Sequence, residues 1–262
     1  MNEILIFVRI LWGVIFFLNA ELIALLIYRR NHRAFPFFFV YVVFNFLQGI
    51  TLFESYRIWG FRASEAFWIA WGSQGLVSTT RALAVAEICR RILRRYSGIW
   101  QLAWRALLTA AIATTAYSLA LAKQSWQLTI LNLDRSLELL IASVIVLLFL
   151  FARYYGVEVE SAIRTIGVGF FLYSSFRVLN ITILERLLHR YAILWNLLEA
   201  VTFLAVLLLW SWALRKAQPA TSLAPELSSE VYYRVIMPEI NVRLRVLNES
   251  LARIWSRKWK ER

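Results

Sequence analysis

The sequence predicts an all-α, polytopic membrane protein built as a bundle of seven transmembrane helices. Hydrophobic residues occupy 60% of the 262 positions and charged residues only 17%, which is too apolar for one core with an ordinary water-exposed surface. Long apolar runs alternate with short polar segments. Lys and Arg gather in alternate segments and near the C-terminal end, as they do in chains that cross a bilayer repeatedly.

Seven windows are apolar and long enough to cross a hydrocarbon layer of about 30 Å, which takes roughly 20 helical residues. They cover 4–28, 35–54, 66–89, 103–122, 128–152, 162–184 and 192–214. Pro36 suits the first turn of the second helix, where its missing N–H would be unpaired in any case. The first residues lack the basic region of a signal peptide, so we expect the first window to be a retained helix.

After the seventh window the long apolar runs end, and prolines and small polar residues follow. We therefore divide the chain into a seven-helix bundle (1–214), a linker (215–238) and a basic amphipathic tail helix (239–262). The tail helix either lies on the inner leaflet or pairs with a partner helix, and disorder of its last residues is a third reading. Its expected contact residues are Arg253, Trp255, Arg257, Lys258, Trp259 and Lys260.

The distribution of cations predicts that the N-terminus is outside the cytoplasm and the tail inside. With this orientation the inner loops hold ten arginines and the outer loops six cations, and the tail adds ten more inside. The same bias explains the formal net charge of +13 through anionic lipid head groups rather than nucleic acid. We expect a lipid bilayer environment, as in a bacterial inner membrane.

Residues for most familiar chemistry are missing from the apolar windows. All four lysines lie outside the core of every window, which argues against a retinal-binding protein. His32 and His189 fall on opposite sides of the membrane, and Cys89 is the only cysteine, so no paired-His or cysteine-based metal site is expected. No motif of a serine hydrolase, zinc protease or P-loop occurs. We therefore expect no enzymatic activity, no cofactor and no metal.

Charged residues inside the apolar windows are the strongest candidates for a site, because a charge at this depth is costly and usually faces the bundle interior with a partner. Counting about 1.5 Å per residue places Arg135, Glu138, Arg177 and Glu199 in the outer half, where they could meet. Asn180 and Asn196, each one turn from a member of this group, complete a polar cluster that could bind a ligand. The same count places Glu21 and Arg81 in the inner half, where they could pair.

Three windows carry polar residues on one face of the helix. The sets are Tyr41, Asn45 and Gln48; Gln74, Ser78 and Arg81; and Tyr173, Arg177 and Asn180. Such stripes either bond helix to helix, or line a ligand pocket or a hydrated path. Both interpretations stay open at this point.

Several features of the first half are typical of one kind of sensor. The first helix ends in Arg29, Arg30 and Arg33, the second begins with Pro36 and Phe37, and the third opens with Phe67 and Trp68. As far as Arg95, this pattern resembles the seven-helix N-terminal sensor region of some bacterial histidine kinases. The tail is too short for kinase domains. The resemblance therefore implies a sensor bundle that signals through a partner protein.

The sequence thus favours a membrane sensor or receptor for a small or lipidic ligand. A structural or assembly subunit of a membrane complex is the first alternative, in which the polar residues only fix helix packing. A small transporter or channel is the second, and it predicts a continuous hydrated path between the inner pair and the outer cluster.

Overall fold

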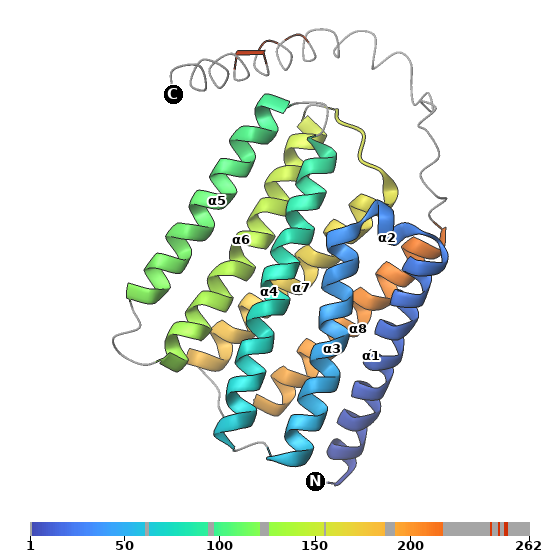
Figure 1. Ribbon diagram of the computed structural model, residues 1–262, viewed down its shortest axis with the longest axis vertical. Helices are drawn as coiled ribbons and strands as arrows, with labels where there is room; N and C mark the ends of the chain where they lie inside the picture. Colours follow the sequence, from blue (N-terminus) through green and yellow to red (C-terminus); the bar gives the residue numbers. More distant parts are fainter. Residues whose placement is uncertain are drawn as a thin grey trace.

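The structure is a computed structural model that describes residues 2–60, 63–93, 97–120, 126–154, 156–186 and 192–216, with Val242, Val246, Glu249 and Ser250. Within these residues the regular structure is entirely helical (Figure 1). The helices are α1 (Asn2–Tyr28), α2 (Asn31–Ala34), α3 (Pro36–Ile58), α4 (Ser64–Ile92), α5 (Ser97–Ala120), α6 (Trp126–Tyr154), α7 (Ser161–Arg186) and α8 (Ala192–Lys216). Most of the expected linker and tail helix lies outside the described residues.

The seven long helices of the described chain coincide with the seven apolar windows, so the all-α prediction is confirmed. Five segments are long and apolar enough to cross a membrane, which makes the chain an integral membrane protein. They are Ile10–Tyr28, Pro36–Ile58, Asn132–Tyr154, Ser161–Ile183 and Leu197–Arg215. α4 and α5 do not meet the same criteria. In α4, several positions that face the interior are polar or charged, among them Ser78, Arg81 and Glu87.

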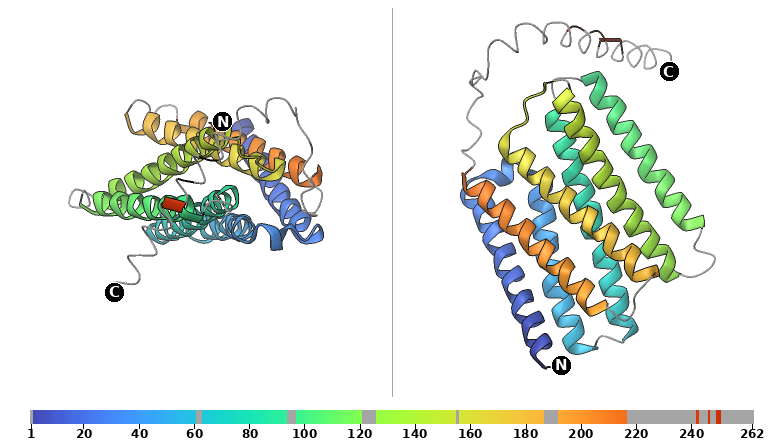
Figure 2. Two further views of the ribbon diagram at one scale, coloured as in Figure 1. Left: turned by 90° about the horizontal axis from the view of Figure 1, so that it is seen from above. Right: turned by 180° about the vertical axis from the view of Figure 1, so that it is seen from behind.

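Six helices form a closed ring, in the order α1, α3, α4, α6, α7, α8 and back to α1. α4 also touches α7 across the interior of the ring. α5 packs on the outside, mainly against α6, and Figure 2 shows it at the edge of the bundle. α1 begins at the end of the bundle opposite to the end where α8 finishes (Figure 1).

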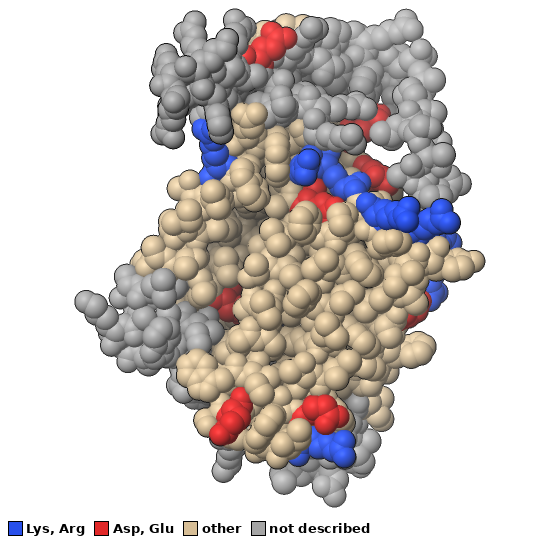
Figure 3. All heavy atoms as spheres, in the orientation of Figure 1, with Lys and Arg blue, Asp and Glu red and all other residues tan. Residues whose placement is uncertain are grey.

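The outer surface of the bundle is apolar. Large hydrophobic side chains on different helices point outward, including Phe17, Ile112, Leu147 and Leu208. The face drawn in Figure 3 is uncharged over most of its middle, and its Lys and Arg side chains gather mainly toward one end. This pattern suits hydrocarbon rather than water as the surrounding medium.

A remote carboxylate caps the start of α3. The backbone N–H groups of Phe37 and Phe38 donate hydrogen bonds of 3.0 and 3.2 Å to Glu87 Oε2 on α4. The first N–H groups of a helix have no partner within it, so this carboxylate satisfies two of them and suits the positive end of the helix dipole. As predicted, Pro36 occupies the first turn. The contact joins the start of α3 to the last turns of α4.

Two glycines let α6 and α8 approach α7 closely. A Cβ atom at Gly169 would lie 2.2 Å from Trp210 Nε1 on α8, and one at Gly167 would lie 2.7 Å from the ring of Phe149 on α6. Trp210 fits there because its Nε1 also donates a hydrogen bond of 3.2 Å to the carbonyl of Ile166. The close packing therefore requires glycine, which has no Cβ atom, at these two positions of α7.

We expect Gly169→Ala to destabilise the bundle, because the added methyl group displaces Trp210 and breaks its hydrogen bond. Overpacking of this kind costs about 1–3 kcal/mol, or a fall of about 2–10 °C in the apparent Tm in detergent. Gly72→Ala in α4 is the matched control, since nothing lies within 4 Å of its Cβ position. The control should be neutral or stabilising by up to about 1 kcal/mol. Equal shifts in both variants would contradict this packing.

Candidate functional site

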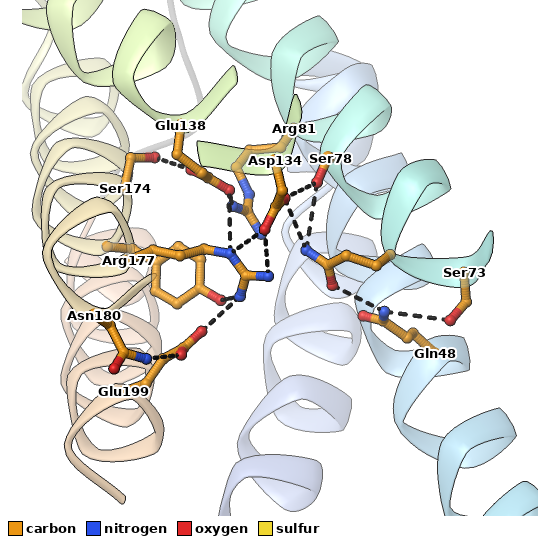
Figure 4. Close-up of polar contacts among 12 residues, drawn as sticks. Gln48, Ser73, Ser78, Arg81, Asp134, Glu138, Ser174, Arg177, Asn180 and Glu199 are labelled. Carbon is orange, nitrogen blue, oxygen red and sulfur yellow. Dashed lines mark hydrogen bonds and ion pairs between the residues drawn. The ribbon is translucent and has the colours of Figure 1, made fainter. Parts of the chain in front are cut away.

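Five charged side chains from four helices meet inside the ring. Figure 4 shows this charged cluster, which consists of Arg81 from α4, Asp134 and Glu138 from α6, Arg177 from α7 and Glu199 from α8. Its position on α7 and α8 is nearer to the end of the bundle where α8 begins. The helices that supply it are consecutive members of the ring, with α4 touching α7 across the interior.

Arg177 is the centre of the charged cluster. Its Nε and Nη2 atoms donate hydrogen bonds of 3.0 and 2.8 Å to Asp134 Oδ2, and its Nη1 donates one of 2.6 Å to Glu199 Oε1. Nη1 also donates to the hydroxyl of Tyr173 at 3.2 Å, and Nε lies 3.8 Å from Glu138 Oε1. One guanidinium group therefore joins α6, α7 and α8.

Arg81 forms the second ion pair and is almost completely buried. Its Nη1 bonds to Glu138 Oε1, and the second carboxylate oxygen of Glu138 accepts a hydrogen bond of 2.6 Å from Ser174. The guanidinium carbon lies 4.6 Å from the ring centre of Tyr173 and 5.4 Å from that of Tyr41. Two aromatic faces thus add cation–π attraction to the ion pair.

Neutral side chains extend the charged cluster toward α3. Ser78 donates a hydrogen bond of 3.1 Å to Asp134 Oδ1, and Gln74 lies at 3.5 Å from the same oxygen. Gln48 on α3 then donates to Gln74 at 3.1 Å and to Ser73 at 3.4 Å. The polar contacts therefore run sideways across α3, α4, α6, α7 and α8, within the width of the bundle rather than along its length (Figure 4).

The spacing of residues along α6 and α7 explains how the charged cluster is assembled. Asp134 and Glu138 are four residues apart, which places both on one face of α6. On α7, Tyr173, Arg177 and Asn180 follow one another at the same helical spacing. When these two faces meet, the arginine of one lies between the carboxylates of the other.

Solvent exposure rises across the charged cluster in one direction. The side chains of Glu138 and Arg81 are 0 and 1% exposed, Asp134 is 7%, Arg177 15% and Glu199 22% exposed. Access to the cluster is therefore from the side of α8. Burying paired charges is expensive, and leaving one of them unpaired is more so.

An aromatic cluster closes the other side. It consists of Phe38 and Tyr41 on α3, Phe170 on α7 and Trp210 on α8, all at most 1% exposed. Phe170 lies 5.0 Å from Trp210 and 5.2 Å from Tyr41 between ring centres. Since Phe170 precedes Arg177 by two turns of α7, these rings lie between the charged cluster and the end of the bundle where α7 begins.

The structure brings together four of the six residues predicted for the outer polar cluster. Glu138, Arg177 and Glu199 are in the charged cluster, and Asn180 Nδ2 bonds to Glu199 Oε2. Arg135 instead donates a hydrogen bond of 2.7 Å to Asn132 of its own helix, because its side chain points about 100° away from Asp134 around α6. The side chain of Asn196 lies outside the described residues.

The predicted pair of Glu21 with Arg81 is wrong. Arg81 contacts Glu138, and Glu21 contacts Arg215 near the end of α8. The reason is the order of helices in the ring: α1 has α3 and α8 as neighbours and makes no contact with α4 among the described residues. Depth along each helix, which motivated the prediction, does not reveal which helices are adjacent.

Asp134 is the principal residue that the sequence interpretation missed. It lies near the start of its apolar window, about 12 Å along α6, which begins at Trp126. Its four-residue spacing from Glu138 was the available signal. The expected tail contacts, Arg253, Trp255, Arg257, Lys258, Trp259 and Lys260, lie outside the described residues.

The chain matches no protein-family model, no curated protein and no solved structure at a significant level. The functional argument therefore depends on the geometry of the bundle.

We expect Arg81→Gln to destabilise the protein strongly, because it leaves the completely buried Glu138 without its closest positive partner. Breaking a buried ion pair in this way costs about 3–5 kcal/mol. Arg215→Gln is the matched control, since its pair with Glu21 is half-exposed, and such pairs are worth about 0–1 kcal/mol. Thermal unfolding in detergent measures both.

The double variant Arg81→Gln, Glu138→Gln tests the pairing itself. Removing both charges should recover part of the stability that Arg81→Gln loses, because no member of this pair is then left unpaired. A double variant no more stable than Arg81→Gln would contradict the assignment of Arg81 to Glu138.

Proposed function

We propose that the protein is a non-enzymatic seven-helix membrane sensor or receptor. It binds a small or lipidic ligand at the charged cluster and passes a conformational change to its basic tail and from there to a partner protein. All seven long helices cross the membrane, with the N-terminus outside and the tail in the cytoplasm of a bacterial cell. Arg177 and Glu199 are the residues at which the ligand acts.

The observation that carries this proposal is the graded access to the charged cluster. Exposure increases from Glu138 to Glu199, whereas the aromatic cluster closes the other side. A receptor needs such a site, open on one side and closed on the other. A transporter needs a continuous polar path to the opposite end, and the buried rings of Phe170 and Trp210 stand across that path.

The cost of the charged cluster also favours a functional role. Packing alone could be achieved with apolar side chains, which are often at least as stabilising as a buried ion pair. Ionisable groups inside a membrane protein are accordingly functional candidates by default. Because Arg177 contacts both α6 and α8, a ligand that competes for it changes how three helices are held together.

The proposed orientation is supported by the ends of the helices. Arg29, Arg30 and Arg33 follow α1, Arg90 and Arg91 end α4, and Arg153 ends α6. These positions are at the same end of the bundle as the finish of α8 (Figure 1). Cations concentrate on the cytoplasmic side of membrane proteins, which is the basis for placing this end inside.

A role as a structural or assembly subunit is the second candidate, and a groove outside the ring favours it. The groove has a volume of about 440 Å³ and lies between α5 and α6, with small and hydroxyl-bearing side chains along it. Its lining is Ala113, Thr114, Tyr117, Ser136, Leu139, Leu140 and Ser143. Small and hydroxylated residues are typical of surfaces on which transmembrane helices pack.

Purification from native membranes in mild detergent, followed by mass spectrometry of extracted compounds, tests the receptor proposal. We expect one compound to be retained by the wild type and by Arg215→Gln, and its amount to fall about tenfold or more in Arg177→Gln, since a lost charged contact costs at least about 1.4 kcal/mol of binding. Equal retention by all three would contradict it.

Ser143→Trp, which fills the groove between α5 and α6, separates the second candidate from the first. If the chain is a subunit of a complex, this variant loses a membrane protein that co-purifies with both the wild type and Arg177→Gln. If it is a receptor, Ser143→Trp retains the bound compound.

A further inference from the structure

The charged cluster contains one more carboxylate than guanidinium group. Arg81 is matched by Glu138 and Arg177 by Asp134, and Glu199 is the additional carboxylate. If all three carboxylates were ionised, the described residues of the cluster would carry an excess negative charge inside a hydrocarbon layer. A charge without compensation in such a medium costs several kcal/mol, and a carboxylate avoids that cost by binding a proton.

Of the three carboxylates, Glu199 makes the fewest contacts with the guanidinium groups of the charged cluster. Asp134 accepts two N–H bonds from Arg177 and one hydroxyl bond, and Glu138 is held by Arg81 and Ser174. Glu199 has a single N–H of Arg177 and the amide of Asn180. It is also the most exposed of the three, so a proton reaches it most easily.

The neighbours of Glu199 leave it without a second positive partner among the described residues. On α7 it faces Arg177, Tyr173 and Asn180, and behind Arg177 lies Asp134 of α6. Arg81 of α4 is engaged by Glu138. On α1, Glu21 contacts Arg215 at the other end of α8, and the side chain of Arg9 lies outside the described residues.

Unpartnered polar atoms give a second, independent indication that the cluster binds more than its own side chains. Asn180 Oδ1, Arg81 Nε and the Tyr41 hydroxyl are buried and have no hydrogen-bond partner in the part of the chain that the structure describes. Buried polar atoms are nearly always hydrogen-bonded, commonly to internal water. Three such atoms at one cluster indicate a site suited to water, which conducts protons. No three His, Cys, Asp or Glu side chains of the described chain are close enough to hold a metal ion.

We propose that Glu199 is a proton-exchange site and that its protonation releases Arg177 from α8. A hydronium ion transfers its proton to a carboxylate oxygen of Glu199: one O–H bond of hydronium breaks, the O–H bond of the carboxyl group forms, and a water molecule is left. A neutral carboxyl group loses the charge–charge attraction to the guanidinium group and keeps only a hydrogen bond to it. Arg177 keeps its two bonds to Asp134, so α8 is the helix that is freed.

This inference extends the proposed function and rests on it, because it takes the movement of α7 relative to α8 as the signal that the receptor transmits. It makes the proton one of the inputs to the receptor.

Infrared difference spectroscopy between alkaline and acidic pH tests the proton site on the purified protein in lipid nanodiscs. The wild type should show the C=O band of a protonated carboxyl group, which Glu199→Gln loses and the matched variant Glu21→Gln keeps. Glu199→Asp should show the band at a shifted frequency, which guards against loss of fold in the Gln variant. Persistence of the band in Glu199→Gln, or its removal by Na⁺ at constant pH, overturns the proposal.

A distance measurement tests the release of α8. Cys89 is the only cysteine, so Cys89→Ala allows spin labels at two outward-facing positions, Leu179→Cys on α7 and Leu198→Cys on α8. The distance between the labels should change with acidification, and Glu199→Gln should give the acidic distance at every pH. A pH-independent distance in the wild type overturns the proposal. The retention of a bound compound is measured separately, so the receptor proposal stands or falls by its own experiment.

Discussion

The interactions of one guanidinium group organise the interior of this bundle. Arg177 bonds at the same time to Asp134 on α6, Tyr173 on its own helix and Glu199 on α8. In the low-dielectric interior of the bundle, such contacts are stronger than on a protein surface. The positions of α6, α7 and α8 in the ring therefore depend on this one side chain. Asp134 extends the connection to α4 through its hydrogen bond with Ser78. No single substituted side chain could keep all of these contacts.

The outside of the bundle is apolar, and its interior combines a hydrophobic core with buried charges. Arg81 and Glu138 are buried, whereas Phe17, Ile112 and Leu147 face outward. Hydrocarbon outside the ring removes the hydrophobic driving force between helices, so packing and polar contacts must hold them together. The close approaches at Gly167 and Gly169 and the charged cluster are the two devices by which this chain meets that requirement.

The sequence predicts the long helices and three members of the charged cluster, Glu138, Arg177 and Glu199. Hydropathy reports the medium around each segment directly, so the long helices coincide with the apolar windows, and Pro36 marks the start of α3. The partners of Arg177 were partly foreseen because depth and helical face can be counted along one segment. The Glu21–Arg81 pair failed because adjacency in the ring depends on the tertiary packing of all the helices. Asp134 was missed because its place near the start of an apolar window does not show that Arg177 of another helix reaches it.

The two glycines of α7 set the kind of movement that this helix allows. Phe149 and Trp210 occupy the spaces at Gly167 and Gly169, so sliding α7 along its axis would drive a larger side chain, such as Phe170, into one of these rings. The longitudinal register of α7 is thereby locked near its beginning. Arg177 lies about 12 Å farther along, beyond this anchor. The movement open to the segment that bears Arg177 is consequently a tilt or a rotation about this anchored region, rather than a translation along the helix axis.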